Sequence, residues 1–161
     1  MTRLLPLLLL LLACGKRPLT APDFGAPVLT PSGAFALYAH TYGAVLPWHL
    51  ETAEASWAHV APCVGVDLAA IRAFPVLLTA GPVVCGDVTR PGCTFLDARP
   101  RVEIIGASFD FDPRRPEASP GPTAEIARLW RHEAIHLALW KRDGDFDGAH
   151  AKAEWRCEVR Q

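Results

Sequence analysis

Residues 132–136 have the types and the spacing that bind a metal ion and activate a water molecule. They form a His-Glu-x-x-His pattern, with histidines at 132 and 136 and a glutamate at 133. A four-residue step in a helix is slightly more than one turn, so His132 and His136 stand on one face and can share one ion. Glu133 is placed to take a proton from a water on that ion. The pattern predicts two metal ligands and a catalytic base.

The flanking residues predict a buried helix for this pattern. Pro122 and Thr123 offer a start, Glu125 suits the positive end of the helix dipole, and Lys141 and Arg142 suit the negative end. Most other positions are apolar: Ile126, Leu129, Trp130, Ile135, Leu137, Leu139 and Trp140. A helix that is apolar on most sides is buried, and polar groups inside it need partners.

This motif resembles the signature of the zincin metallopeptidases. The resemblance covers the motif, its helix and the segment after it. It implies a Zn²⁺ cofactor, a peptide or protein substrate, and hydrolysis of the peptide bond with Glu133 as the base. It also implies an edge strand beside the active site, for which residues 102–107 are the candidate. The Pro-rich residues 109–122 are either a wall of that cleft or a solvated connection.

A catalytic zinc ion takes three protein ligands and leaves one position open, so a third ligand is expected after the helix. His150 is favoured because glycines at 144 and 148 allow the chain to reverse toward the metal. Asp145 or Asp147 would then accept the second ring N–H of a ligand histidine. Glu154 is the alternative ligand. The metzincin continuation is missing, since Leu139 and Arg142 replace its Gly and third His.

The same segment matches a calcium-binding loop. Asp143, Asp145, Asp147, Gly148 and Glu154 satisfy the EF-hand pattern. Against it, only one such loop is present, and His150 stands where an aliphatic residue is usual. A Ca²⁺ site therefore stays open as an alternative to the zinc site.

The N-terminus predicts export. Residues 1–13 combine a short basic start with an apolar run and predict a signal peptide. The run ends in Leu11-Leu12-Ala13-Cys14-Gly15, which resembles the bacterial lipobox. That resemblance implies cleavage before Cys14 and a lipid on its thiol, which would anchor the protein to a bacterial membrane on the extracytoplasmic side of the cell envelope. Residues 14–31, with prolines at 18, 22, 27 and 31, predict a linker.

The remaining cysteines agree with an oxidising compartment. Cys63, Cys85, Cys93 and Cys157 are even in number, so two disulfides are expected. We favour Cys85–Cys93, across a predicted hairpin, and Cys63–Cys157. A zinc site of four cysteines is the alternative, although no Cys-x-x-Cys pair is present.

The rest of the chain predicts one α+β domain over residues 32–161, with a small, mostly antiparallel sheet packed on the buried helix. A helix is expected over residues 47–61, ended by Pro62, with His49 and His59 on its surface. Strands are expected at 73–78, 83–88, 94–96 and 102–105.

The net charge of −1 gives no reason to expect nucleic acid as a partner, and we expect a monomer. The residue that would stabilise an oxyanion stays open among Tyr38, Tyr42, Arg101 and Arg114. A second hypothesis is a non-catalytic envelope lipoprotein in which zinc or calcium only stabilises the domain.

Overall fold

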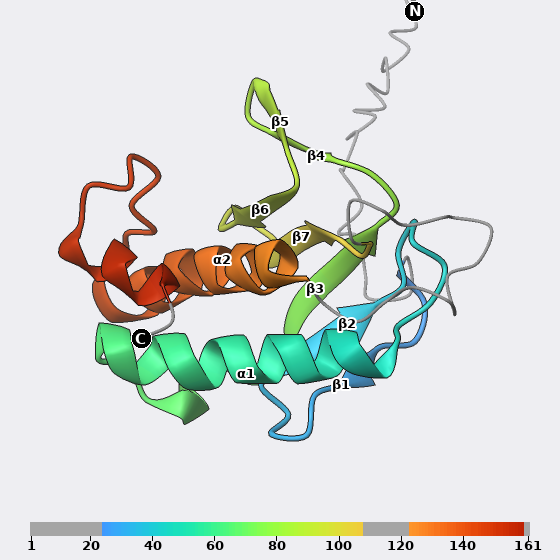
Figure 1. The fold of residues 1–161 in the computed structure, drawn as a ribbon, viewed down its shortest axis with the longest axis horizontal. Coiled ribbons are helices and arrows are strands. Elements are labelled where there is room, and N and C mark those ends of the chain that lie inside the picture. Colours follow the sequence, from blue (N-terminus) through green and yellow to red (C-terminus); the bar gives the residue numbers. More distant parts are fainter. Residues whose placement is uncertain (1–23, 108–122, 160–161) are drawn as a thin grey trace, which may run out of the picture.

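A computed structural model describes residues 24–107 and 123–159. In this part of the chain a five-stranded sheet packs against two α-helices, which confirms the predicted α+β class (Figure 1). The strands are β1 (Val28–Leu29), β2 (Phe35–Tyr38), β3 (Phe74–Thr79), β4 (Val83–Cys85), β5 (Val88–Arg90), β6 (Gly92–Phe95) and β7 (Arg101–Ile105). The helices are α1 (Pro47–Val64) and α2 (Ala124–Asp143), with short 3-10 turns η2 (Leu68–Ala70) and η4 (Ala153–Glu158).

The sheet has the strand order β1-β2-β3-β7-β6, and β4 and β5 form a separate hairpin. Three of the five pairings between these described strands are antiparallel, but β2–β3 and β3–β7 at the centre are parallel. Strand β7 therefore lies inside the sheet, and the prediction that residues 102–107 form the edge strand is wrong. The edge strand next to α2 is β6, because the chain turns back after β6 and places β7 between it and β3.

Both helices cover one face of the sheet. Alternate residues of the central strands, such as Leu37, Val76 and Ile104, join the helices in one core. From α2, Ile126, Ile135, Leu137 and Leu139 are completely buried there. The buried helix predicted from its apolar pattern is thus confirmed.

The N-terminal boundary of the folded domain differs from the prediction. Val28 and Leu29 already pair with β2, so the sheet begins before residue 32, within the range predicted as a linker. The predicted strand at 83–88 is two strands, because Gly86 has a φ of 66° and reverses the chain. None of the described helices is long and apolar enough to cross a membrane. The predicted signal peptide, Cys14 and the Pro-rich residues 109–122 lie outside the described residues.

Helix α1 continues past Pro62, which was expected to end it. The proline lies in the last turn, so the N–H that it lacks costs the helix one hydrogen bond near its end. Gly65 then ends the helix in the left-handed region with a φ of 84°, and the N–H of Val66 donates to the carbonyl of Ala61 at 2.7 Å.

His49 of α1 is not on the surface, contrary to the prediction. The Nδ1 atom of His49 accepts the N–H of Leu46 at 2.8 Å, so Nε2 carries the proton and donates to the carbonyl of Gly106 at 2.7 Å. His49 is fully buried, which lowers its pKa to about 4. His59 is half-buried and lies 3.0 Å from the carbonyl of Cys157.

Both predicted disulfides are confirmed. Cys63 at the end of α1 is bonded to Cys157 in η4, and Cys85 in β4 is bonded to Cys93 in β6. The first bond holds the C-terminal segment against the helices. The second ties the β4–β5 hairpin to the edge strand. The alternative of a zinc site made from these four cysteines is therefore wrong.

The buried His49 makes a specific prediction about stability and pH. The pKa of His49 is lower in the folded state than in the unfolded state. Between pH 6.5 and pH 4 the imidazole is therefore protonated in unfolded chains but stays neutral in folded chains. Stability from this group is present above pH 6.5 and is lost as the pH falls. Urea unfolding of the wild type should show about 2 kcal/mol more loss between pH 7 and pH 5 than His49→Gln shows. Equal losses in the two proteins would contradict the burial of a neutral His49.

Candidate metal centre

Three histidines from two segments converge on one point. His132, His136 and His150 each offer a ring nitrogen, and these three atoms lie within 4.8 Å of one another. The Nε2 atoms of His136 and His150 are 3.3 Å apart. Tetrahedral bonds of about 2.0–2.1 Å would separate two ligand nitrogens by about 3.3 Å, so this pair already has the spacing of metal ligands. The prediction that His150 joins the two helix histidines is confirmed.

His132 and His136 lie on helix α2, and both ends of this helix are capped. The side chain of Thr123 accepts the N–H of Ile126 at 3.3 Å, and Glu125 lies in the first turn. At the other end Gly144 adopts a φ of 73°, and its N–H donates to the carbonyl of Trp140 at 2.8 Å. The left-handed residue turns the chain back along the helix and so allows His150 to return.

Carboxylates shape the loop that carries His150. Asp145 accepts the N–H of Asp147 at 3.0 Å, and buried Asp147 accepts the N–H of Lys152 and the indole N–H of Trp155, both at 2.8 Å. Asp147 and His150 themselves have φ values of 50° and 55°, which residues with side chains seldom adopt. These hydrogen bonds stabilise the strained backbone that points His150 at the helix.

The loop does not gather its acids around a calcium ion. Asp143 pairs with Arg142 and Lys152, at 2.7 and 2.9 Å, and Asp145 also pairs with Lys152 at 3.2 Å. Glu154 turns to Arg142 at 2.7 Å. Among the described residues, the potential metal ligands that converge in a group of three or more are the three histidines, and the acids of the loop are not part of it. The structure therefore gives no support to a calcium site, or to Glu154 as a zinc ligand.

The partners of the rings leave nitrogen lone pairs facing one another. The Nδ1 atom of His136 donates to the carbonyl of Phe146 at 2.6 Å, so its Nε2 is the free acceptor. The Nδ1 atom of His132 lies 3.3 Å from the carboxylate of Glu158. Asp145 or Asp147 was predicted to accept the second ring N–H of a ligand histidine, and this is wrong because both are used within the loop.

Burial keeps the two helix histidines neutral. It lowers the pKa of His136 to about 4, and it also lowers the pKa of His132 although Glu158 acts in the opposite direction. Neutral imidazole is the form that binds metals. His136 is buried, His132 is partly buried and His150 is exposed, so the cluster opens to solvent on the side of His150.

Trp155 is a part of the centre that the sequence analysis missed. Its ring centroid lies 4.8 Å from those of His132 and His136 and 4.2 Å from that of His150. Its indole N–H is held by Asp147, and the neighbouring Cys157 fixes η4 to α1. The ring therefore packs against all three imidazoles. No local pattern marks a tryptophan for this role.

Glu133 lies buried between α2 and the edge strand. The hydroxyl of Thr94 donates to one carboxylate oxygen at 2.7 Å. The other oxygen lies against Gly92, where an added Cβ would come within 2.9 Å of it. Burial raises the pKa of Glu133 to about 7, against the opposing effect of the Thr94 hydrogen bond. Gly92 and Thr94, two residues apart on one face of β6, thus fix the carboxylate.

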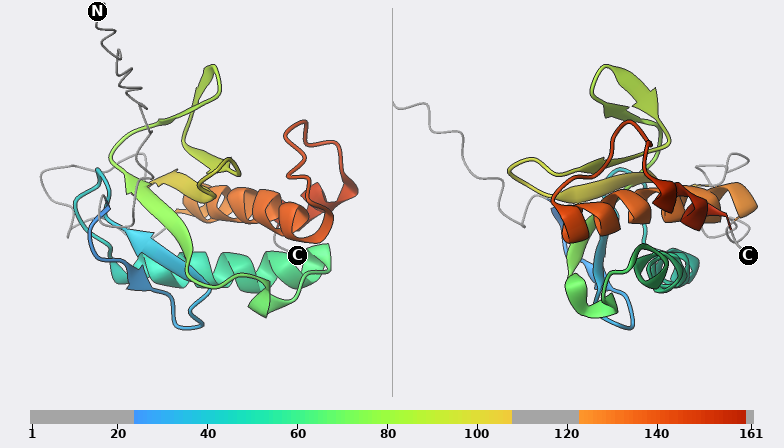
Figure 2. Two further views of the ribbon diagram at one scale, coloured as in Figure 1. Left: turned by 180° about the vertical axis from the view of Figure 1, so that it is seen from behind. Right: turned by 90° about the vertical axis from the view of Figure 1, so that its left-hand side faces the viewer.

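The cluster opens into a cleft of about 640 Å³. The β4–β5 hairpin and the loop 144–152 rise on the same side of α2, in both views of Figure 2. Both contribute to its lining, together with β6, α2 and η4. The lining residues include Val88, Arg90, Gly92, Thr94, Glu125, Arg128, Leu129, His132, Glu133, His136, Phe146, His150 and Glu158.

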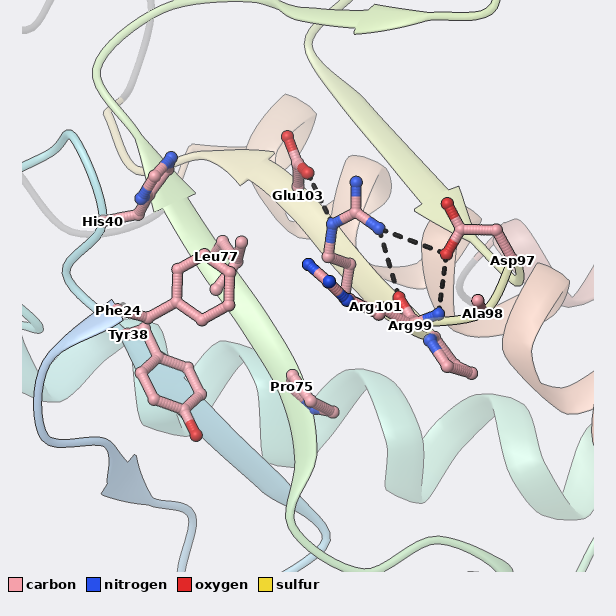
Figure 3. A pocket seen from close by; sticks show the side chains of 11 residues that line it. Phe24, Tyr38, His40, Pro75, Leu77, Asp97, Ala98, Arg99, Arg101 and Glu103 are labelled. Carbon is pink, nitrogen blue, oxygen red and sulfur yellow. Dashed lines mark hydrogen bonds and ion pairs between the residues drawn. The ribbon is translucent and has the colours of Figure 1, made fainter. Parts of the chain in front are cut away.

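Three of the residues proposed from sequence to stabilise an oxyanion are described by the structure, and none of these three lines the cleft. Tyr38 and Arg101 line a different hollow, on the opposite face of the sheet, and Arg101 is bonded there to Asp97 and Glu103 (Figure 3). Tyr42 is buried against Gly106 and His49. Arg114 lies outside the described residues. The cations of the metal cleft are instead Arg90 and Arg128.

No protein-family model, curated protein or solved structure matches the chain. The interpretation of the centre therefore rests on its geometry.

The geometry predicts an order of Zn²⁺ affinities, measurable by titration against a competing chelator. His150→Ala should weaken binding by more than ~100-fold because a ligand is lost. Glu158→Gln should weaken it by ~10-fold or more, because His132 loses the charge that orients it. The matched control is Glu154→Gln, which should bind as the wild type does. Equal affinities for the wild type and His150→Ala would exclude His150 as a ligand.

Proposed function

We propose that the protein is a zinc-dependent peptidase. The observation that carries the proposal is the convergence of three histidines beside a buried glutamate of raised pKa, in an open cleft. Three protein ligands with one open position are typical of catalytic zinc, whereas structural zinc is closed by four. In the described residues the converging group supplies three imidazole nitrogens and no thiolate.

The three-nitrogen donor set fits zinc. Imidazole suits Zn²⁺ well, and carboxylate oxygens, which calcium requires, are bound elsewhere in the loop. When bound, zinc would supply a Lewis acid that lowers the pKa of a water and polarises the carbonyl of a substrate.

Glu133 would move the proton in this reaction. A base works best when its pKa lies near the working pH, and burial brings that of Glu133 to about 7. As a carboxylate it would accept the proton of the attacking water. As a carboxylic acid it would then give that proton to the leaving amine. Thr94 and Gly92 hold the carboxylate in one place throughout, which preserves the alignment.

Strand β6 supports a peptide as the substrate. It ends the sheet on the side of the cleft, and Gly92, Cys93 and Thr94 line that cleft. An edge strand offers main-chain N–H and C=O groups to which an extended peptide can add as a further strand. A peptide bound along β6 would lie beside Glu133.

The base can be tested by removing its charge. Glu133→Gln keeps the shape of the side chain but cannot accept a proton, so peptide hydrolysis should fall by ~100-fold or more with zinc still bound. Cleavage of a peptide library and of an unfolded reference protein, followed by mass spectrometry, measures this. Glu125→Gln is the matched control, because Glu125 lines the same cleft on the same helix. Wild-type cleavage by Glu133→Gln would refute the mechanism.

We further propose that the domain is held at the cell envelope by a lipid on Cys14. The lipobox-like residues 11–15 and the two disulfides support an extracytoplasmic location. In a bacterial host, Cys14→Ser should shift the protein from the membrane fraction to an unprocessed or soluble form. Mass spectrometry of the mature wild type that finds an unmodified Cys14 would contradict the anchor.

A further inference from the structure

Two exposed apolar side chains line the metal cleft. Large hydrophobic side chains are exposed at seven described positions: Val28, Leu29, Leu68, Val84, Val88, Phe146 and Val159. Of these, Val88 and Phe146 line the cleft, and they come from the β4–β5 hairpin and from the loop 144–152. Their exposed fractions are 43% and 42%. Exposed apolar side chains inside a binding cleft are available to be covered by a ligand.

Phe146 is fixed next to the metal centre by both its main chain and its ring. Its carbonyl accepts the ring N–H of His136, and its ring centroid lies 5.8 Å from that of His136. The ring also lies over Gly148, where an added Cβ would be 3.0 Å from it. The glycine thus leaves the room that this ring occupies. A side chain held in this way presents a defined apolar surface to a bound peptide.

Val88 is fixed to the part of the sheet that contacts the base. It pairs with Cys85 across the hairpin, and Cys85 is bonded to Cys93 of the edge strand. Cys93 stands between Gly92 and Thr94, the two residues that hold Glu133. The position of Val88 relative to the reacting atoms is therefore set by one hairpin pair and one covalent bond.

The charged side chains that line the cleft have both signs, so they do not favour a substrate of one charge. Arg90 and Glu125 both line it and have opposite signs, while Arg128 is paired with Glu158 at 3.1 Å. Leu129 adds a partly buried apolar side chain to the lining. The walls thus combine charges of both signs with an apolar surface made by Val88, Phe146 and Leu129.

We infer that the cleft selects peptides with a large apolar side chain beside the cleaved bond, and that Phe146 and Val88 are the specificity-determining residues. This inference rests on the proposed peptidase function. A pocket that gains or loses apolar contact changes kcat/KM by ~10- to 200-fold per group. Truncating Phe146 should therefore weaken the preference without touching the ligands, since its main-chain carbonyl remains.

The test is a cleavage profile of the full mature protein on a peptide library, measured for the wild type, Phe146→Ala and Val88→Ala. The wild type should favour Leu, Ile, Met or Phe next to the cut. Phe146→Ala should lose ~10-fold or more in kcat/KM on those peptides and little on peptides with Gly or Ser there. Val84→Ala is the matched control, because Val84 is on the same hairpin but does not line the cleft. A flat or charge-directed wild-type profile, or a profile unchanged in Phe146→Ala with zinc bound, would overturn the inference.

A binding measurement separates this inference from the proposed function. Zinc-loaded Glu133→Gln is titrated with a fluorescent Leu-containing peptide and with its Ser-containing match. Tighter binding of the Leu peptide that Phe146→Ala abolishes supports apolar selection, even if the wild type cleaves nothing and the peptidase proposal fails. Equal binding of the two peptides overturns the selection, whether or not the wild type cleaves.

Discussion

The burial of the Glu133 carboxylate is the constraint on which the rest of the centre depends. A carboxylate taken out of water destabilises the fold unless a donor satisfies it. The donor is Thr94, and the space is left by Gly92, so the edge strand must lie directly against α2. Antiparallel pairing with β7 and the Cys85–Cys93 bond keep β6 in that position. The sheet is thereby a component of the site as well as its support.

The electrostatic arrangement around the centre follows from the burial of the helix histidines. Helix histidines that stay neutral can approach one another without mutual repulsion, and their lone pairs remain available. The acids of the following loop are bonded to Arg142, Lys152 and main-chain N–H groups, so they shape the backbone and do not join the histidine cluster. The histidines therefore form the candidate metal centre, whereas the acids next to them in sequence stabilise the loop.

Local sequence predicted what depends on local geometry. The spacing in α2 and the glycines after it were enough to predict the convergence of His150, because one helical turn and one reversal decide it. The surface placement of His49 was wrong, since periodicity identifies a helix face but not the segment that covers it. The edge strand was wrong because strand order is a long-range property. Trp155 and Glu158 were missed because only the fold-back of the C-terminal segment brings them to the metal centre.

The bond between Cys63 and Cys157 has a consequence for the preorganisation of the candidate metal centre. It closes a loop over a sequence separation of 94, which contains β3 to β7, α2 and the loop 144–152. Closing a loop of this size removes conformational entropy from the unfolded chain that corresponds to about 4–5 kcal/mol at 25 °C. Trp155 and Glu158 flank Cys157, so the cross-link holds both beside the imidazoles before any ion arrives. Most of the conformational entropy of the three histidines is therefore lost during oxidative folding, so a metal ion would bind to a preorganised centre.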